Sequence, residues 1–346
     1  MIVQNLAYPR SGLLGNPSDI FGGKVISLLF DAFSTQVTLY ESPQISIIPN
    51  SRDSRNFEDI EGLVEYRTRF GYYGGIRLIE ALIVRFHHYC QEKEIKLPKA
   101  NFTIQYKSDI PFGLGLGGSS AIITAAFRAL MEFFSLTEKD IPLPEQPNII
   151  LEAETKELGI TAGPQDRVIA VYGGVVAMDF SKKTYERNNG LHGDYSRLKE
   201  DSLPSLYIAY NENLSKSSGK IHNIMRYRVN KEQDNLIAEV MKQKANLVDK
   251  AINLIESGKG KEIGPLMDED FNLRASVYNL PNPQVNMIMI ARKNGSHAKF
   301  SGSGGAVIGT YQDENHLTSL VTAFQLEGLS ILPVKIANHG SKRKFN

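Results

Sequence analysis

The sequence predicts an α+β fold of two domains. Predicted strands and helices are mixed along the chain without the strict alternation of a parallel α/β protein. The 346 residues are too many for one ordinary hydrophobic core, and the polar stretch at 181–201 is the best candidate for a junction. We therefore expect an N-terminal domain over residues 1–190, a C-terminal domain over residues 200–340 and a small basic tail at 341–346.

The N-terminal half contains both strand-like and helix-like segments. Runs rich in β-branched and aromatic residues, bounded by proline, serine and asparagine, predict strands. Apolar residues at positions i, i+3 and i+4 predict helices, and one segment that is apolar on most faces predicts a buried helix. The polar residues 49–70 predict a loop. The strands are expected at 24–30, 36–40, 45–48 and 102–106, and the helices at 71–90, 119–134 (the buried one) and 148–158.

Glycine-centred turns are expected in both halves of the chain. Residues 168–180 predict two β-rich pieces around Gly173 and Gly174, and residues 299–309 predict a strand, a glycine turn and a strand. The other C-terminal elements are expected to be strands at 205–210 and 331–336 and helices at 232–257 and 285–294.

The charge balance excludes several classes of partner. Lys plus Arg number 39 and Asp plus Glu number 38, so the net charge is +1. No global field attracts nucleic acid or an anionic membrane, and an anionic substrate must be held by a local site. The single cysteine, Cys90, excludes an intrachain disulfide. There is no signal-peptide pattern and no run near the ~18 apolar residues of a membrane span, so we expect a cytoplasmic monomer or homodimer.

The most informative local pattern is the glycine-serine loop PFGLGLGGSSA at residues 111–121. It follows a predicted strand and opens a predicted helix. The unpaired N–H groups and the dipole at a helix start attract phosphate, and glycines let the backbone approach the oxygens. The loop has neither a Walker A motif nor the spacing of a dinucleotide fingerprint, and a purely structural turn is the alternative. The candidate ATP-phosphate ligands are Gly113, Gly115, Gly117, Gly118, Ser119 and Ser120.

This loop resembles the second motif of the galactokinase, homoserine kinase, mevalonate kinase and phosphomevalonate kinase (GHMP) superfamily. Residues 7–23 are similar to its N-terminal sugar motif, and residues 299–306 to its C-terminal glycine motif. The resemblance implies a GHMP kinase fold: a ribosomal-protein-S5-domain-2-like ATP domain, a ferredoxin-like C-terminal α/β sandwich and an active site between them. It also implies ATP as co-substrate and Mg²⁺ as cofactor.

Within the superfamily, the chain resembles the glucuronokinases. The similar segments lie at residues 71–78, 157–180, 218–222 and 333–337. The resemblance implies transfer of a phosphoryl group to the anomeric hydroxyl of D-glucuronate, giving D-glucuronate 1-phosphate and ADP. Another sugar kinase, acting on galactose, arabinose or a heptose phosphate, and a catalytically silent regulator that binds sugar or nucleotide are the alternatives.

The sequence also departs from the superfamily in two places. Asn16 and Pro17 stand where galactokinases carry an acidic residue and a histidine, which disfavours galactose. The phosphate loop is one residue longer than the usual pattern, a length that glucuronokinases share.

The resemblance assigns two catalytic residues. Asp166 stands at the position of the catalytic aspartate, where it would accept the proton of the sugar hydroxyl. From the residues alone, Asp166 could equally cap the helix that follows. Arg10 is expected beside Asp166, adding positive charge at the transferred phosphoryl group, and a surface arginine is the alternative.

Ser120 and Glu154 are the candidate magnesium ligands, because hard oxygens suit that ion. Glu152 and Glu157 lie on the same predicted helix. Positions 154 and 157 are one turn apart and share a face, so the spacing alone does not choose between them.

The sugar site is expected to combine a carboxylate with glycines that let the backbone approach the substrate closely. Asp19 matches the position from which sugar kinases bind hydroxyl groups, since a carboxylate accepts two donors; an Asx-turn is the alternative. A uronate also requires a cation, and Arg167, Lys220 and Arg274 are the candidates. The glycine candidates are Gly22, Gly23, Gly302, Gly304 and Gly305.

Overall fold

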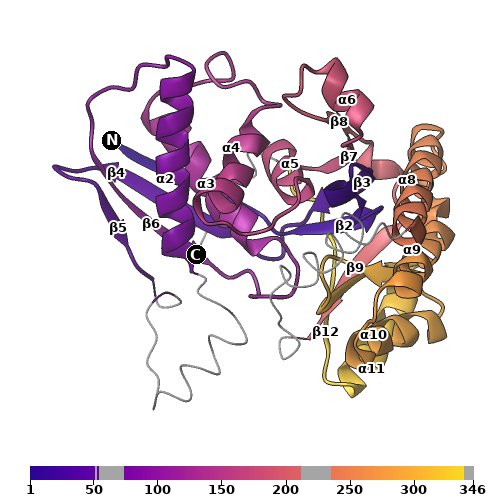
Figure 1. The fold of residues 1–346 in the computed structure, drawn as a ribbon. Helices are drawn as coiled ribbons and strands as arrows, with labels where there is room; N and C mark the ends of the chain where they lie inside the picture. The colour runs from indigo at the N-terminus through magenta and orange to yellow at the C-terminus, as the bar shows by residue number, and fades with distance from the viewer. Residues whose placement is uncertain (51–52, 54–73, 212–234, 339–346) are drawn as a thin grey trace.

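The computed structural model describes residues 1–50, 53, 74–211 and 235–338, and the described residues form three four-stranded sheets with helices around them (Figure 1). Several predicted segments fall wholly or partly outside these ranges. They are the loop at 49–70, the start of the helix at 71–90, the start of the helix at 232–257, the motif at 218–222 with Lys220, and the tail at 341–346.

The first sheet has the strand order β1-β4-β6-β5 and carries two helices. In β4, buried Val37 and Leu39 alternate with more exposed residues, so one face of the sheet packs against α3. Helix α2 packs on α3, where the rings of Phe86 and Phe127 meet edge to face (Figure 1). The elements are β1 (Ile2–Ala7), β4 (Thr35–Glu41), β5 (Ser46–Ile48), β6 (Phe102–Ser108), α2 (Gly75–Glu92) and α3 (Gly118–Phe133).

The second sheet has the order β2-β3-β7-β8, with every pair antiparallel. Strand β2 is buried at every position, and β3 packs against α8. The ammonium group of Lys24 in β3 lies 2.7 Å from the carboxylate of Asp249 in α8. The elements are β2 (Arg10–Leu14), β3 (Lys24–Leu29), β7 (Val175–Asp179), β8 (Asp194–Arg197) and α8 (Asn235–Glu256).

The third sheet has the order β10-β11-β9-β12 and is drawn from the C-terminal part of the chain. The helices that follow β9 gather on its side of the molecule, in orange and yellow (Figure 1). The apolar faces of the last three of these helices, α9, α10 and α11, share a core with the sheet that includes Phe271, Phe300 and Phe324. The elements are β9 (Ser205–Tyr210), β10 (Ala298–Phe300), β11 (Ala306–Tyr311), β12 (Ser330–Pro333), α9 (Gly264–Val277), α10 (Asn282–Lys293) and α11 (Glu314–Leu326).

Shorter elements connect the sheets, and one prediction for this part is corrected. Residues 168–172 are helical rather than a β-rich piece, because α5 begins after Pro164 and buries Val168, Ile169 and Val171; packing overrides the local β preference. The stretch at 181–201, the candidate for a domain junction, contains α6 and β8. The connecting elements are η1 (Ser18–Phe21), α4 (Gln146–Glu152), η2 (Ala153–Glu157), α5 (Gln165–Tyr172), α6 (Lys182–Arg187), η3 (Glu200–Ser202) and η5 (Gly260–Ile263).

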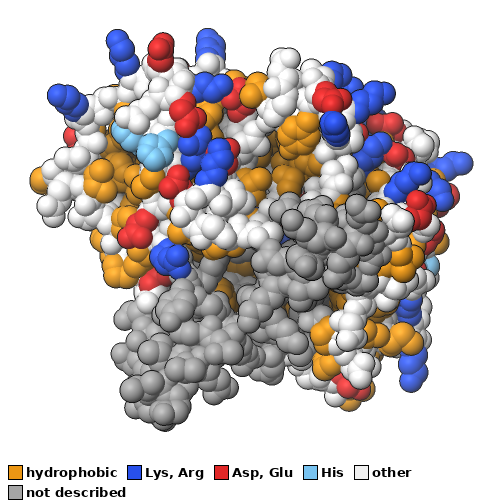
Figure 2. Space-filling view, viewed as in Figure 1, with side chains coloured by type: hydrophobic (Ala, Val, Ile, Leu, Met, Phe, Trp, Pro, Cys, Tyr) orange, Lys and Arg blue, Asp and Glu red, His pale blue; other side chains and the backbone are white. Residues whose placement is uncertain are grey.

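The mixture of helices and largely antiparallel sheets confirms the α+β class. On the face shown in Figure 2, basic and acidic side chains are intermixed, in agreement with the balanced net charge. Among the described residues, no helix is both long and apolar enough to cross a membrane.

Candidate active site

Three sequence motifs that are far apart in the chain meet at the start of β2. The amide of Arg10 donates to the carbonyl of Leu116 in the phosphate loop at 2.9 Å, and the amide of Gly12 donates to the carbonyl of Ser301 at 2.8 Å. The hydroxyl of Ser301 also donates to the hydroxyl of Ser11 at 2.8 Å. Strand β2 therefore lies between the phosphate loop and the C-terminal glycine motif.

Arg10 and Asp166 form a two-pronged ion pair, which we call the catalytic pair. The Arg10 Nε donates to Asp166 Oδ1 at 2.7 Å, and Nη2 donates to Oδ2 at 2.8 Å. The remaining guanidinium nitrogen donates to the carbonyls of Gly115 and Ser301. Arg10 is only 8% exposed, so the surface-arginine alternative is wrong. One side chain thus connects Asp166 to both glycine motifs.

Asp166 lies in the first turn of α5 and does not cap that helix. The residue before the helix is Pro164, and no side chain caps its start. The carboxylate of Asp166 is instead held by Arg10, and its side chain is 20% exposed. The capping alternative is therefore wrong, and the carboxylate is oriented by a cation from another element.

The phosphate loop has the backbone shape that its glycines suggested. Gly113, Gly115 and Gly117 have φ angles of 72°, 71° and 75°, a region that favours glycine. Helix α3 begins at Gly118, and no side chain caps its start. A Cβ on Gly115 would lie 2.7 Å from the amide nitrogen of Ser303. The N–H groups at the start of α3, including those of Ser119 and Ser120, therefore have no side-chain acceptor to compete with an anion.

The two candidate metal ligands differ in their partners. The hydroxyl of Ser120 is buried and has no hydrogen-bond partner among the described residues. Glu154 is also buried, at 2% exposure, and its carboxylate pairs with the guanidinium of Arg167. Within the described ranges, no group of three or more His, Cys, Asp and Glu side chains could hold a metal ion by itself. This donor set fits a magnesium ion that takes its other ligands from nucleotide phosphates and water.

The structure separates the three glutamates that the sequence left equivalent. After α4 the chain adopts a π-helical turn, η2, and Glu154 within it faces Arg167. Glu152, at the end of α4, pairs with Arg85 of α2 at 2.5 Å, whereas Glu157 lies 3.8 Å from His88 of the same helix. Glu154 alone is directed towards the helix that carries Asp166.

Asp19 lies beside the catalytic pair. It is 7% exposed, and its carboxylate accepts a hydrogen bond of 3.3 Å from the amide of Gln165, the neighbour of Asp166. Burial, assisted by the negative charge of Asp166, raises the pKa of Asp19 to about 6. The side chain reaches α5 rather than forming only a local Asx-turn. Its neighbours Gly22 and Gly23 shape the turn after η1, where Gly22 has a φ of 72°.

The C-terminal glycines differ in their surroundings. Gly302 lies against the phosphate loop, and a Cβ there would be 2.7 Å from Nη1 of Arg10. Gly304 packs on the side chain of Gln284 in α10, which indicates a packing role, and Gly305 has a φ of 85°. Only Gly302 of the three is therefore seen next to the catalytic pair.

The three cationic candidates for a uronate are also distinguished. Arg167 pairs with Glu154 and donates to the carbonyl of Gly163 at 2.9 Å, so its charge is already engaged. Lys220 lies outside the described residues. Arg274 donates to the carbonyls of Gly302 at 2.7 Å and Ser303 at 3.3 Å, and therefore holds the C-terminal glycine motif in place.

One group of functional neighbours escaped the sequence analysis. The ammonium of Lys299 is buried and donates to the carbonyl of Gly12 at 3.0 Å and to the side chain of Asn16. It also lies 3.6 Å from the carboxylate of Asp270, whose other oxygen accepts from the amide of Gly15 at 2.8 Å. Lys299 and Asp270 thus anchor the segment that leads to Asp19. The spacing of these residues gives no signal, because they meet only through tertiary contacts.

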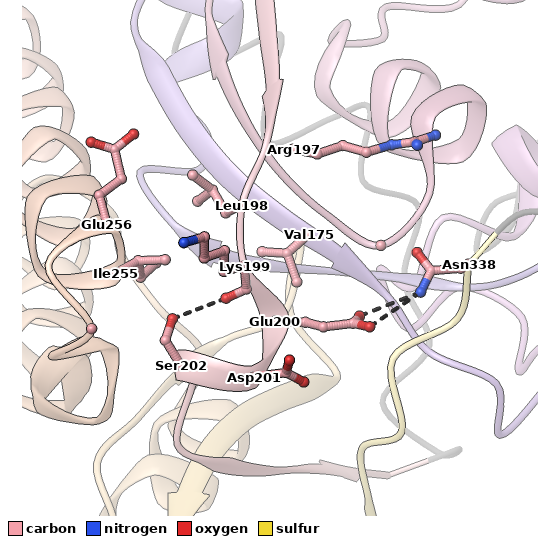
Figure 3. A pocket seen from close by; sticks show the side chains of 12 residues that line it. Val175, Arg197, Leu198, Lys199, Glu200, Asp201, Ser202, Ile255, Glu256 and Asn338 are labelled. Carbon is pink, nitrogen blue, oxygen red and sulfur yellow. Dashed lines mark hydrogen bonds between the residues drawn. The ribbon is translucent and has the colours of Figure 1, made fainter.

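A separate cavity of about 540 Å³ is lined mainly by residues at the end of β8, in η3 and at the end of α8 (Figure 3). The Asn338 amide donates to the Glu200 carboxylate there at 3.3 Å, and the Ser202 hydroxyl donates to the carbonyl of Lys199 at 2.9 Å. None of the predicted site residues lines it. The lining residues are Gly174, Val175, Arg197, Leu198, Lys199, Glu200, Asp201, Ser202, Ile255, Glu256, Gly258 and Asn338.

Comparison with known proteins agrees with this geometry. The GHMP kinases N terminal domain matches residues 79–174, which include the phosphate loop and Asp166. Glucuronokinase 1 of Arabidopsis thaliana is 37% identical over 340 residues, covering 97% of this chain and 92% of that protein. Probable glucuronokinase 2 of the same organism is 38% identical over 312 residues, covering 89% and 84%. The structure of Streptococcus pneumoniae phosphomevalonate kinase has a TM-score of 0.73 at 12% identity, covering 97% of this chain and 100% of that one.

The fold, the phosphate loop and the nearly full-length similarity agree with one another. The resemblance inferred from the three motifs is confirmed. The chain belongs to the GHMP kinase superfamily and, within it, to the glucuronokinase family of ATP-dependent sugar kinases.

Proposed function

We propose that the protein transfers the γ-phosphoryl group of ATP to the anomeric hydroxyl of D-glucuronate, giving D-glucuronate 1-phosphate and ADP. The observation that carries this proposal is the catalytic pair, in which Arg10 holds Asp166 at 2.7 and 2.8 Å beside the phosphate loop. The similarity to two glucuronokinases over most of the chain supports the choice of sugar. We also propose that the first two sheets form the N-terminal domain and the third sheet the C-terminal domain, with the site between them.

Asp166 would act as the general base. Its carboxylate would accept the proton of the anomeric hydroxyl while that oxygen bonds to the γ-phosphorus and the bond to the β–γ bridging oxygen breaks. Arg10 fixes the carboxylate from one side, which leaves its partly exposed edge for the sugar. The guanidinium would also offset the negative charge that develops on the transferred group.

The phosphate loop and the start of α3 would bind the triphosphate. The N–H groups at the start of α3, which no described side chain caps, favour an anion, and the glycines allow close approach. Ser120 and Glu154 would hold a magnesium ion, which neutralises phosphate charge when bound. The unsatisfied hydroxyl of Ser120 supports this assignment. Arg167, which lies between Glu154 and Asp166, would hold the two carboxylates in fixed positions relative to each other.

Asp19 would bind sugar hydroxyls next to the base, because its carboxylate accepts a hydrogen bond from the amide of Gln165, the residue before Asp166. A catalytically silent regulator is not favoured, because a protein that only binds ligands does not need an arginine that holds a carboxylate through two hydrogen bonds, as Arg10 holds Asp166. The four residues Arg10, Ser120, Glu154 and Asp166 together are what phosphoryl transfer requires.

The test is an ADP-release assay of the full chain with Mg-ATP and a panel of sugars: D-glucuronate, D-galactose, L-arabinose and D-glycero-D-manno-heptose 7-phosphate. We expect the highest kcat/KM with D-glucuronate, and phosphorus NMR of the product should show an anomeric phosphate. A much higher kcat/KM with galactose, arabinose or the heptose phosphate would overturn the choice of sugar. Absence of turnover with every sugar, despite ATP binding, would favour the regulator.

A further inference from the structure

Arg274 is a buried arginine that forms no ion pair with a described carboxylate. It lies near the end of α9, is 3% exposed, and its Nε has no hydrogen-bond partner in the described ranges. Other buried arginines are neutralised: Arg10 pairs with Asp166, Arg85 with Glu92, and Arg167 with Glu154. An unpaired buried charge is costly, so a guanidinium in this state calls for an anion that the described residues do not supply.

The surroundings of Arg274 are more positive still. Lys244, Asp270, Arg274 and Lys299 form what we call the cationic cluster, in which three cations share one carboxylate. The ammonium of Lys244 lies 2.8 Å from Asp270 Oδ2, and that of Lys299 lies 3.6 Å from the same oxygen. Burial and the positive charges of Lys244 and Arg274 lower the pKa of Lys299 to about 7. Even when Lys299 is uncharged, Lys244 and Arg274 outnumber Asp270, so the cluster carries surplus positive charge next to the sugar motif.

Tyr278 adds a second unsatisfied donor one turn along from Arg274. Its side chain is buried, and its hydroxyl has no hydrogen-bond partner within the described ranges. The Arg274 guanidinium lies 5.3 Å from the centre of the Tyr278 ring. Burial raises the pKa of Tyr278, the charge of Arg274 lowers it, and the charge of Asp19 raises it. Tyr278 is therefore within electrostatic reach of both Arg274 and the proposed sugar-binding carboxylate.

Arg274 is linked to the catalytic pair through one glycine. Its Nη1 donates to the carbonyl of Gly302 at 2.7 Å, and a Cβ at Gly302 would lie 2.7 Å from Nη1 of Arg10. Arg10 in turn holds Asp166. Arg274 therefore contacts the glycine turn that lies against the catalytic pair.

We propose that Arg274 and Tyr278 bind the carboxylate of the sugar acid and make the site selective for a uronate over a neutral sugar. This inference rests on the proposed function. One carboxylate oxygen would accept from Arg274 Nε and the other from the Tyr278 hydroxyl, in the manner of charge-assisted hydrogen bonds. A neutral hexose, with a CH₂OH group at the same position, leaves the charge of the cationic cluster uncompensated and is rejected for that reason.

The competing explanation is that Arg274 serves only to hold the glycine turn through Gly302 and Ser303. The two explanations differ in one measurable quantity, the ratio of kcat/KM for D-glucuronate to that for D-glucose. These sugars share their ring and their anomeric hydroxyl. Loss of a merely structural arginine lowers both values together, whereas loss of a carboxylate ligand lowers the ratio.

The experiment uses the full chain with Tyr278→Phe and Arg274→Lys. Tyr278→Phe keeps the ring and removes only the unsatisfied hydroxyl, so its folding should be unimpaired. We expect kcat/KM for glucuronate to fall about 10- to 100-fold in each variant, mainly through KM, as for one hydrogen bond to a charged group. The ratio of kcat/KM for D-glucuronate to that for D-glucose should therefore fall by at least about tenfold in each variant.

Matched controls separate this effect from general damage to the C-terminal part. Tyr207→Phe removes a buried hydroxyl that binds Ser296 at 2.9 Å, and Arg292→Lys alters an arginine that pairs with Asp268 at 3.0 Å. Both should leave the sugar ratio unchanged. An equal fall for both sugars in Tyr278→Phe and Arg274→Lys would overturn the inference while leaving the proposed function intact. Turnover of neutral sugars but not of glucuronate by the unaltered protein would instead overturn the proposed function.

Discussion

The site contains two charged groups of residues that are balanced in opposite ways. In the catalytic pair, one guanidinium meets one carboxylate at 2.7 and 2.8 Å. In the cationic cluster, three cations share the carboxylate of Asp270. A balanced pair can hold a base in a fixed orientation, whereas a surplus of buried positive charge is relieved by an anion or by deprotonation of a lysine. The difference accords with our proposal that the catalytic pair performs chemistry and that Arg274 selects the substrate.

The largest expected effect comes from breaking the balanced pair. Asp166→Asn keeps the shape of the side chain but removes the base, so kcat should fall by ~10²-fold or more. The KM for sugar and the affinity for ATP should change little, as measured by steady-state kinetics and titration calorimetry. A parallel loss of ATP affinity would show that Asp166 is needed for the structure of the phosphate loop instead.

Lys299, the member of the cationic cluster that anchors the segment before Asp19, should affect stability. Lys299→Met removes hydrogen bonds to the carbonyl of Gly12 and to Asn16, so the free energy of unfolding should fall by about 2 kcal/mol. The matched control is Lys182→Met, whose side chain is 91% exposed and which should change stability by less than about 0.5 kcal/mol.

The effect of Lys299→Met on the free energy of unfolding should also depend on pH. The pKa of Lys299 is lowered from 10.5 to about 7 in the folded state, so between these values the unfolded chain binds more protons. Unfolding free energy then rises with pH in this window, and Lys299→Met lacks that rise. Urea denaturation near neutral pH and at about pH 9 should therefore show a larger deficit of the variant at the higher pH. A deficit that is constant with pH would contradict a charged-to-neutral transition at Lys299.

A smaller effect is expected at the proposed metal ligand. Ser120→Ala removes a buried hydroxyl without a described partner, so stability should change by less than about 0.5 kcal/mol. The magnesium concentration for half-maximal activity should rise by about tenfold, measured at constant ATP. An unchanged magnesium requirement would exclude this hydroxyl as a ligand.

The smallest effect concerns Asp19, whose pKa is raised to about 6 by burial. Below that value the side chain is protonated and accepts fewer hydrogen bonds, so the KM for sugar should rise about fourfold from about pH 7 to about pH 5.5. Asp19→Asn should show a higher KM that no longer depends on pH in this range. A pH-dependent KM that persists in Asp19→Asn would assign the titration to another group.

Local patterns predicted those parts of the molecule that local energetics determine. The strand at 205–210 and the phosphate loop are found where periodicity and glycine spacing placed them. Helix α5 was missed in its second half because its β-branched residues are buried on several sides, so packing decides its conformation. Strand β2 gave no alternating signal, since all of its residues are buried.

The same limit applied to the candidate site, because its residues could be named from the sequence but their contacts could not. Asp166 and Arg10 were assigned through the resemblance, and their pairing is a contact across 156 positions that no periodicity reveals. Arg274 was named as one of three candidate cations, but Lys244, Asp270 and Lys299 were missed because they lie on α8, α9 and β10 and each looks like an ordinary surface charge in the sequence. Only burial distinguishes them, and burial is a property of the folded chain.

The π-helical turn at Ala153–Glu157 has a consequence for insertions and deletions in this family. It accommodates one residue more than an α-helical turn would, and each residue rotates a helix by about 100°. Deleting a residue next to Glu154 would restore a regular helix but rotate Glu154 away from Arg167 and the helix that carries Asp166. The number of residues in this short helix therefore matters for the position of Glu154.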